Sequence, residues 1–307
     1  MKDTYKKQVQ LLLDVLPEVA KETCFAMHGG TAINLFCRDM PRLSVDIDLT
    51  YVPLAERAAT LEGINQALER VQQNIQALRG SIQVQHRADV CKLQVSEYDV
   101  LIKIEVNMVG RGLIAERVKM PLCERAQEQF DVFCAIPIVP IAQLYGGKLC
   151  AALDRQHPRD LFDVKLMLQE EGFSDEIKRG LIYALLGSTR PIYEMLDPHL
   201  LDQRSAYENQ FVGMSDSSFD YDDYESTRNT LIRVIRERMT DADKAFLIGF
   251  NRLEPDWSIY DFENFPSVKW KLLNLRKFME QNPQEWKQQI DKLEAILMTN
   301  KKGHALT

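Results

Sequence analysis

The residues best suited to do chemistry are two aspartates, Asp46 and Asp48, in the segment SVDIDL. Polar and apolar side chains alternate there, which predicts a half-buried strand over residues 43–51. Side chains at positions i and i+2 of a strand point to the same side, so both carboxylates can share divalent ions. Such ions neutralise a triphosphate and activate an attacking hydroxyl in phosphoryl-type transfer. We therefore predict that Asp46 and Asp48 bind Mg²⁺.

A glycine pair precedes these aspartates in the chain. Gly29, Gly30 and Thr31 predict a tight turn before a helix over residues 32–37. The N–H groups of such a turn can meet phosphate, and the Thr31 hydroxyl adds a donor at the partially positive helix end. A lone D-x-D is usually a solvated strand face and a lone G-G-T only a turn. Turn, helix and strand in this order favour a triphosphate site.

A second alternating segment, KIEVN, contains Glu105. On an exposed strand this pattern is ordinary amphipathicity. If the strand lies beside the one that carries Asp46 and Asp48, Glu105 supplies a third carboxylate for the metal.

Two adjacent glycines, Gly146 and Gly147, interrupt a predicted helix over residues 141–153. Each weakens a helix by about 1 kcal/mol relative to alanine, so the pair suggests close approach by another backbone or by a ligand. Lys148 follows directly and could hold a phosphate as a point charge.

A second predicted helix, over residues 159–168, carries Asp160, which could orient Lys148 or position an acceptor. The alternative is that Arg159 and Asp163 form a surface ion pair at i and i+4 and that Lys148 is solvated.

The remaining pattern is typical of an α+β fold, with strands in the first 140 residues and helices beyond. Further predicted strands cover residues 82–95 and 100–108, residues 24–27 are a short strand or a helix end, and a break falls at Pro137 and Pro140. Further predicted helices cover residues 4–23, 54–78, 268–279 and 283–298, with a loop over 215–225 and an N-cap at Thr240.

The composition is that of an ordinary globular protein. Of 307 residues, 45% are hydrophobic and 27% are charged, and the six cysteines form no C-x-x-C pair. No apolar run approaches the length of a membrane span, so we expect a cytoplasmic protein without a membrane partner. The net charge of −7 argues against nucleic acid binding over the whole surface.

One segment is nevertheless basic. Residues 267–303 contain eight Lys and Arg against four Asp and Glu. Lys269, Lys271, Arg276 and Lys277 share one predicted helix and could form a face that tracks phosphates. The alternative is a solvated amphipathic helix, with Trp270, Leu273 and Leu275 in packing.

Three stretches together resemble a known family. The chain resembles the AbiEii/AbiGii family of nucleotidyltransferase toxins in the stretches HGGTAINLFCRDMPRLSVDIDLTY, KIEVN and LYGGKLCAALDRQHPRDLFDV. This family belongs to type IV toxin–antitoxin systems of abortive infection and is related to the MenT toxins. The matching segments span roughly residues 25–168. The resemblance implies a polymerase-β-like nucleotidyltransferase core with a mixed sheet over residues 1–168. A mainly helical C-terminal domain over residues 169–307 would follow.

The resemblance also carries site residues. The glycine turn and D-x-D of the family fall on Gly29, Gly30, Thr31, Asp46 and Asp48, and its later lysine and aspartate on Lys148 and Asp160. Asp163 competes with Asp160 for the last role. Threonine stands at position 31 where many members have serine, which keeps the hydroxyl.

The implied activity is Mg²⁺-dependent transfer of a nucleotide from an NTP to an acceptor, releasing pyrophosphate. The acceptor implied by the resemblance is the 3′ end of tRNA, whose modification would inhibit translation and growth. A cognate antitoxin encoded nearby is the implied partner. The residues themselves leave open a small-molecule or protein acceptor, or a non-catalytic nucleotide-binding module.

Overall fold

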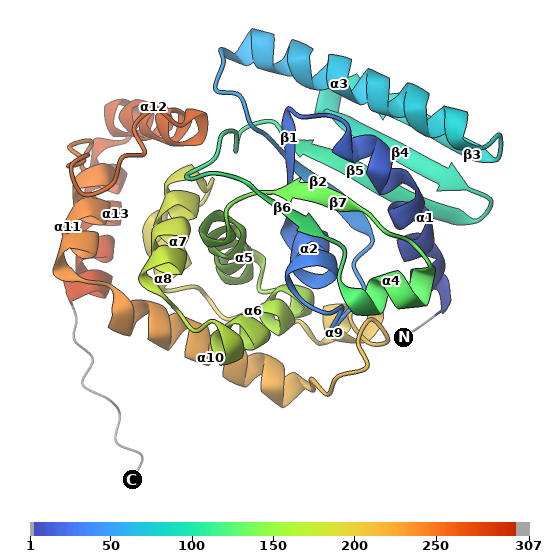
Figure 1. Ribbon diagram of the computed structural model, residues 1–307. Helices are drawn as coiled ribbons and strands as arrows, with labels where there is room; N and C mark the ends of the chain where they lie inside the picture. Colours follow the sequence, from blue (N-terminus) through green and yellow to red (C-terminus); the bar gives the residue numbers. More distant parts are fainter. Residues whose placement is uncertain (1–2, 299–307) are drawn as a thin grey trace.

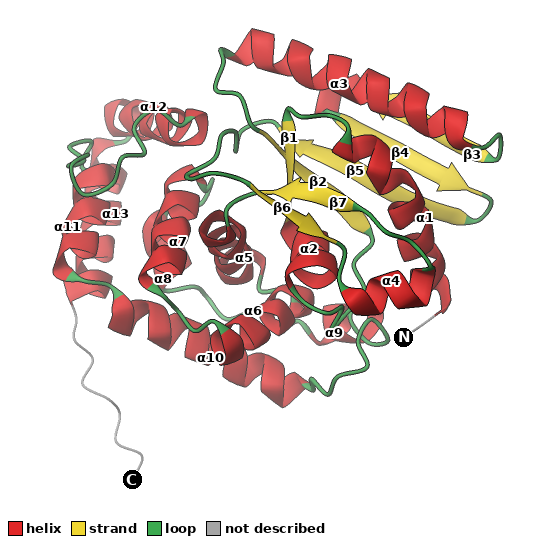
Figure 2. Ribbon diagram, viewed as in Figure 1, coloured by secondary structure: helices red, strands yellow, loops and turns green. Residues whose placement is uncertain are grey.

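A mixed β-sheet forms one side of the molecule, and most helices of the second half of the chain form the other (Figures 1 and 2). The computed structural model describes residues 3–298. The strands are β1 (Phe25–His28), β2 (Asp46–Tyr51), β3 (Ile82–Arg87), β4 (Lys92–Glu97), β5 (Val100–Asn107), β6 (Val118–Pro121) and β7 (Ala135–Ile138). Their order in the seven-stranded sheet is β3-β4-β5-β2-β1-β7-β6. The predicted α+β class with a mixed sheet is confirmed.

The helices before residue 160 are α1 (Asp3–Ala20), α2 (Gly29–Ala32), α3 (Arg57–Leu78), α4 (Glu124–Phe130) and α5 (Ile141–Arg155). Those that follow are α6 (Pro158–Glu170), α7 (Asp175–Gly187), α8 (Ile192–Leu196), α9 (Arg204–Gln210), α10 (Tyr221–Arg238), α11 (Asp241–Asn251), α12 (Pro266–Gln281) and α13 (Pro283–Met298). Helix α1 packs against β5 and β7, and α3 packs against β3 and β4 (Figure 1).

The centre of the sheet places the two aspartates. β2 runs antiparallel to β1 and parallel to β5, so Asp48 lies beside His28 on one side and Glu105 on the other. Ile47 and Leu49 are fully buried, whereas Asp46 and Asp48 point to the opposite face and are half-buried. The predicted alternation of β2 is confirmed, because one apolar face must enter the core.

Several elements differ from the sequence prediction. The glycine turn is itself the start of a helix, because α2 begins at Gly29 and continues into a π-helical turn, η1 (Ile33–Cys37). The predicted strand over 82–95 is two strands separated by a 3₁₀ turn, η2 (Ala88–Val90). Cys91 after this turn has φ of 49°, a conformation that a continuous strand does not allow.

Other differences concern prolines and acidic residues. Pro137, where a break was expected, lies inside β7, a strand of only four residues that pairs with both β1 and β6. β6 and α4 were not predicted. The loop expected over 215–225 ends early, because Asp220 and Asp223 form a capping box that starts α10. The N-cap expected at Thr240 is confirmed by its bond from the Asp243 N–H.

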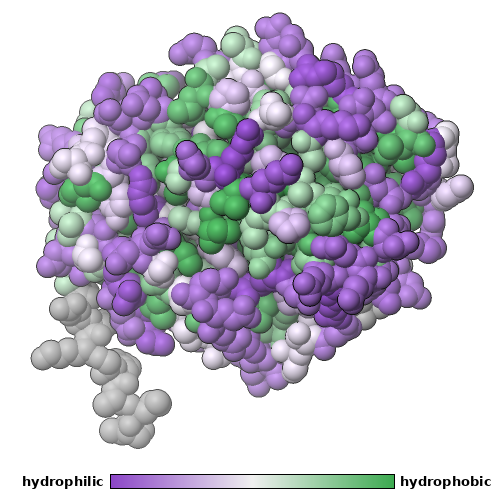
Figure 3. All heavy atoms as spheres, viewed as in Figure 1, coloured by the Kyte–Doolittle hydropathy of each residue, from purple (hydrophilic) through white to green (hydrophobic). Residues whose placement is uncertain are grey.

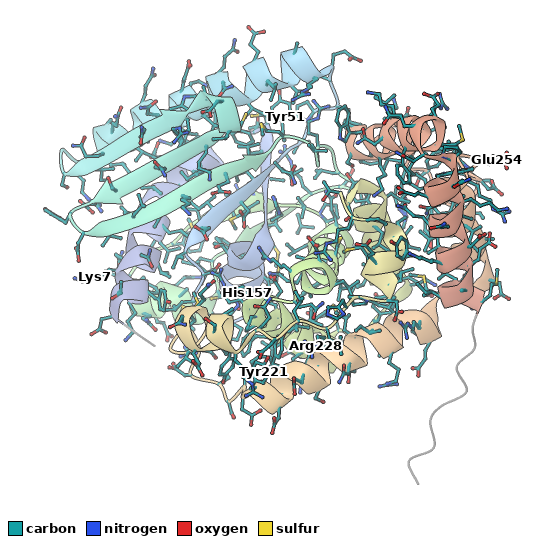
Figure 4. The ribbon with its side chains drawn as sticks, turned by 180° about the vertical axis from the view of Figure 1, so that it is seen from behind. Lys7, Tyr51, His157, Tyr221, Arg228 and Glu254 are labelled. Atoms are coloured by element: carbon teal, nitrogen blue, oxygen red, sulfur yellow. The ribbon has the colours of Figure 1, made fainter. Side chains whose placement is uncertain are left out.

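Helix α10 closes the helical layer from below in Figure 1. Seen from behind, His157, Tyr221 and Arg228 lie where α10 meets its neighbours (Figure 4). The Arg228 guanidinium donates to the Leu201 carbonyl at 2.7 Å, and the Tyr224 hydroxyl donates to the Gln156 carbonyl at 2.9 Å. In the view of Figure 1, hydrophilic residues cover most of the rim of the molecule and apolar residues gather nearer its middle (Figure 3). No helix of residues 3–298 is long and apolar enough to cross a membrane.

The two glycines of α5 have different surroundings. A Cβ built on Gly146 would lie 2.1 Å from the backbone carbon of Gly180 in α7, whereas one built on Gly147 would have no atom within 4 Å. Gly146 therefore permits backbone contact between α5 and α7, which was one of the two expectations for the pair. This contact crosses residue 168, and the division of the chain there stays a prediction.

Gly146→Ala and Gly147→Ala should change stability in opposite directions. The first methyl group overlaps the α7 backbone, so we expect a loss of about 3 kcal/mol or more in the free energy of unfolding. The second enters open space in a helix interior, where alanine is favoured by about 1 kcal/mol. Urea denaturation of both variants tests this. Equal stabilities would contradict the close helix crossing.

Candidate active site

Asp46 and Asp48 have side chains without a hydrogen bond or ion pair to any residue of the described chain. Burial and the neighbouring Asp48 raise the pKa of Asp46, although Lys103 and Arg159 oppose this shift. Two adjacent carboxylates without partners repel each other, and a divalent cation would remove that repulsion. Because Mg²⁺ prefers oxygen ligands and often takes only one or two carboxylates beside substrate phosphates, the pair fits this ion.

Gly29 and Gly30 fit closely around this pair. Gly29 has φ of 78°, and a Cβ built on it would lie 2.3 Å from the Asp48 Oδ2. A Cβ on Gly30 would lie 2.8 Å from the Arg42 Nη2. No side chain caps this helix start, so the N–H groups of its first turn remain available.

Thr31 lies differently from the expectation. Its side chain is fully buried, and the hydroxyl donates to the Asp46 carbonyl at 2.5 Å, with the Ser44 hydroxyl 3.0 Å away. In this structure Thr31 therefore fixes the strand that carries the aspartates and does not face the cavity. The helix starts at Gly29, three residues earlier than predicted, so position 31 lies inside the helix and its side chain faces β2.

Glu105 lies on the expected face, since β5 is the direct neighbour of β2. Its carboxylate, however, forms an ion pair with the Lys92 ammonium at 2.6 Å. No group of three His, Cys, Asp or Glu side chains within residues 3–298 is close enough to hold a metal. A ligand role for Glu105 stays a prediction that would require it to leave Lys92.

Lys148 is buried and paired with carboxylates. Its ammonium lies 2.9 Å from the Asp160 Oδ1 and 3.0 Å from the Asp163 Oδ2. The Arg155 guanidinium also binds Asp160, at 2.6 and 3.0 Å. The expectation that Asp160 orients Lys148 agrees with this geometry, and the alternative of a solvated Lys148 is wrong.

Asp163 anchors the other half of this cluster. Its two carboxylate oxygens accept from the Arg42 Nε and Nη2 at 2.7 and 2.6 Å, and Asn34 donates to it at 3.0 Å. Asp163 is fully buried, so a surface ion pair with Arg159 is excluded. Burial opposes ionisation of the carboxyl, but Arg42 and Lys148 outweigh burial and lower the pKa of Asp163.

Four residues at the site were missed by sequence reasoning: His28, Arg42, Arg155 and Arg159. Burial lowers the pKa of His28, which lies beside Asp48. The Arg159 guanidinium has no hydrogen bond or ion pair in the described chain, and burial followed by Arg42 lowers its pKa. Arg159 is the neighbour of Asp160 in the sequence, but no sequence pattern indicated that Arg159 approaches Asp46.

His28, Asp48, Lys148 and Arg155 border a cavity of about 890 Å³. One end is lined by Gly29, Gly30, Asp48, Lys148 and Arg155, and the other by α7, the segment after it, α12 and α13. The volume is within the range of small-molecule and cofactor sites. The helical half of the chain therefore forms one wall of the site.

The predicted basic face of α12 is only partly present. Lys271 is buried, because its ammonium donates to the Ser188 and Arg190 carbonyls at 2.7 and 2.6 Å. Burial lowers the pKa of Lys271 to about 8. Lys269, Arg276 and Lys277 are exposed, and the end of the basic segment lies outside the described residues.

The site thus combines a glycine-led helix, two unpaired aspartates on one strand face and a cavity that Asp48 lines, and this combination suits a nucleotidyltransferase. The family described as "Nucleotidyl transferase AbiEii toxin, Type IV TA system" matches residues 10–300, and the chain belongs to that family. It is accordingly a nucleotidyltransferase of a type IV toxin–antitoxin family, which confirms the predicted family and enzyme class and implies an NTP substrate and an antitoxin partner.

A solved structure supports the fold. MenT4, a nucleotidyltransferase toxin from Mycobacterium tuberculosis H37Rv, is similar with a TM-score of 0.62 and 14% sequence identity, covering 89% of this chain and 95% of that chain. No curated protein sequence matches the chain.

Proposed function

We propose that the chain transfers a nucleotide from an NTP to the 3′ end of tRNA in a Mg²⁺-dependent reaction, and that this inhibits translation and growth. The observation that carries the proposal is the unpartnered state of Asp48, which lines a large cavity, and of Asp46 on the same face of β2, while Asp160 and Asp163 nearby are fully paired. Two adjacent half-buried carboxylates that lack partners suit a cation, and a cation bound with a triphosphate would remove the repulsion between them.

In this proposal, Asp46 and Asp48 hold the ion, which on binding would polarise the α-phosphate and favour ionisation of the acceptor hydroxyl. The first-turn N–H groups at Gly29 and Gly30 donate hydrogen bonds to the triphosphate oxygens. The acceptor oxygen forms a bond to the α-phosphorus, the bond to the bridging oxygen breaks, and pyrophosphate leaves. Chemistry of this kind depends mainly on positioning and charge stabilisation.

Lys148 supplies a fixed positive charge to phosphate at the cavity wall, because Asp160 and Asp163 keep it ionised and hold its ammonium in place. The unpaired guanidinium of Arg159 provides a second cation close to Asp46. An arginine can bind two phosphate oxygens at once, which a lysine cannot.

The tRNA acceptor is supported by the resemblance of the motifs to toxins that modify tRNA. A small-molecule acceptor is the second candidate, favoured by the net charge of −7 and by the burial of Lys271, which removes one cation from the expected RNA-binding face. The two acceptors differ in the salt dependence of binding, because RNA binding releases counterions. For each phosphate contacted, the logarithm of RNA affinity falls by about 0.7 to 0.9 per tenfold rise in salt concentration.

Incubation of the protein with each of four α-labelled NTPs and total cellular RNA tests the proposal. We expect Mg²⁺-dependent label in a band of tRNA size, lost on chelation, on ribonuclease treatment, and on oxidation of the RNA 3′ ends with periodate. The apparent RNA affinity should fall steeply between 0.05 and 0.2 M salt. Absence of labelled RNA with all four NTPs would exclude the tRNA acceptor, and labelling of a small-molecule fraction would support the alternative.

A further inference from the structure

The end of the cavity farthest from the metal aspartates has no role in the transfer reaction described above. Its wall is formed by α12 and α13, and the side chains there are Trp270, Asn274, Phe278 and Gln289. In the proposed function, the triphosphate binds at Gly29, Gly30 and Lys148. A cavity of about 890 Å³ therefore leaves room for a second chemical group of the same ligand or of its acceptor.

The cavity face of α12 follows helical spacing. Trp270, Asn274 and Phe278 lie four residues apart in succession, so they form one continuous stripe along the helix. Trp270 is 48% exposed, although large aromatic side chains usually bury most of their surface. Trp270 is one of the residues that line the cavity. The sequence prediction that Trp270 takes part in packing is thus incomplete.

Two amide side chains border the same space without partners. Neither Asn274 nor Gln289 makes a side-chain hydrogen bond to any residue of the described chain. Each amide offers two N–H donors and one carbonyl acceptor. A flat aromatic surface flanked by free amides suits a planar heterocycle that carries donors and acceptors on its edge, which is the chemistry of a nucleobase.

Contacts of α12 with α7 and with the segment after α7 hold this part of the cavity wall in place. The buried Lys271 ties α12 to the segment after α7 through the Ser188 and Arg190 carbonyls. The helices are also close, since a Cβ built on Gly187 would lie 3.1 Å from the Ser267 Cβ. A surface held in place before binding loses little conformational freedom when a ligand arrives.

We propose that Trp270 forms a stacking platform for a nucleobase and that Asn274 and Gln289 contact its edge. The proposal rests on the proposed function, because it places a nucleobase in the same cavity as the triphosphate site. The nucleobase belongs either to the NTP or to the terminal nucleotide of the acceptor, and the two sources share this chemistry. Asn274 then determines base preference, because stacking on Trp270 is open to every base.

The test compares Trp270→Ala and Asn274→Ala with Leu273→Ala. Leu273 is a matched control, because it lies on the same helix, is 43% exposed and does not line the cavity. Dissociation constants are measured by calorimetry with Mg²⁺ for each NTP and for inorganic tripolyphosphate, which has no base. The KM for RNA is measured separately, and circular dichroism melting checks that each variant is folded.

If the base is that of the NTP, Trp270→Ala should weaken NTP binding by about 5- to 100-fold and leave tripolyphosphate binding unchanged. If it is that of the acceptor, the KM for RNA should rise instead, with NTP binding unchanged. In either case Asn274→Ala should alter the preference among bases, Trp270→Phe should retain part of the binding, and Leu273→Ala should behave as wild type.

The platform would be overturned if Trp270→Ala had the same NTP affinity and the same KM for RNA as Leu273→Ala. Wild-type protein that bound tripolyphosphate as tightly as every NTP, with no change in the KM for RNA in any variant, would also overturn it and leave the transfer reaction standing. Protein that bound NTPs more tightly than tripolyphosphate through Trp270, but labelled no RNA, would support the platform and contradict only the proposed acceptor.

Discussion

Asp48→Asn and Asp46→Asn should each reduce nucleotidyl transfer by roughly 10³-fold or more while the protein stays folded. Asparagine has almost the same volume but removes one of the two charges that hold the ion. Because the two carboxylates repel each other in the absence of a cation and have no partner in the described chain, the substitution should not lower the stability of the metal-free protein. Substitution of a residue that stabilises the fold would instead lower the stability of the metal-free protein.

Thermal melting with and without Mg²⁺ gives a readout independent of activity. Wild-type protein should melt at a higher temperature with Mg²⁺, since an ion that binds only the folded state stabilises it. Both asparagine variants should lose this shift, and Asp99→Asn, at an exposed turn, should keep it. Glu105→Gln decides its own role, because loss of the shift would make Glu105 a ligand. Near-normal turnover in either aspartate variant would contradict the assigned metal site.

The parts of the site that follow from local sequence pattern were predictable. The alternation around Asp46 and Asp48 is a property of six neighbouring residues, and burial of Ile47 and Leu49 fixes the face of both carboxylates. The close packing of α5 was also indicated, because adjacent glycines weaken a helix unless something approaches it. The partner, Gly180, could not be named, since helix pairing depends on the whole fold.

Side chains whose surroundings come from distant segments were not predictable. Arg42 and Asp163 are 121 positions apart, and neither shows by itself that it will be buried with the other. Lys271 reads as a solvated cation, because its burial depends on two carbonyls that α7 and its following segment bring to it. Thr31 was misplaced because the helix start shifted by a few residues. A shift of that size rotates a side chain to another face.

Asp163→Ala should be the most destabilising substitution in the charged cluster. It leaves the Arg42 guanidinium and one side of the Lys148 ammonium buried without their anion. Breaking a buried pair from one side costs about 3–5 kcal/mol, because an uncompensated charge remains out of water. We expect a fall in melting temperature on the order of 10 °C.

The double variant Arg42→Met/Asp163→Leu separates charge from packing. It removes both charges and keeps apolar volume, and Lys148 retains Asp160 as its counter-ion. Replacement of a buried ion pair as a whole often costs little, so the double variant should be more stable than Asp163→Ala. Arg233→Ala breaks an exposed pair with Glu237 and should change stability by less than about 1 kcal/mol.

The difference in stability between wild type and Asp163→Ala should depend on pH in a defined direction. Because the folded protein lowers the pKa of Asp163, its ionised form contributes stability above the pKa of the unfolded chain, about 3.9. That contribution is lost as the pH falls toward the lower pKa of the folded state. Urea denaturation of wild type and Asp163→Ala should therefore show a constant gap above pH 5 that narrows below pH 4. A gap that widens in acid, or a double variant as unstable as the single one, would mean that Asp163 stabilises the fold by packing and not by its charge.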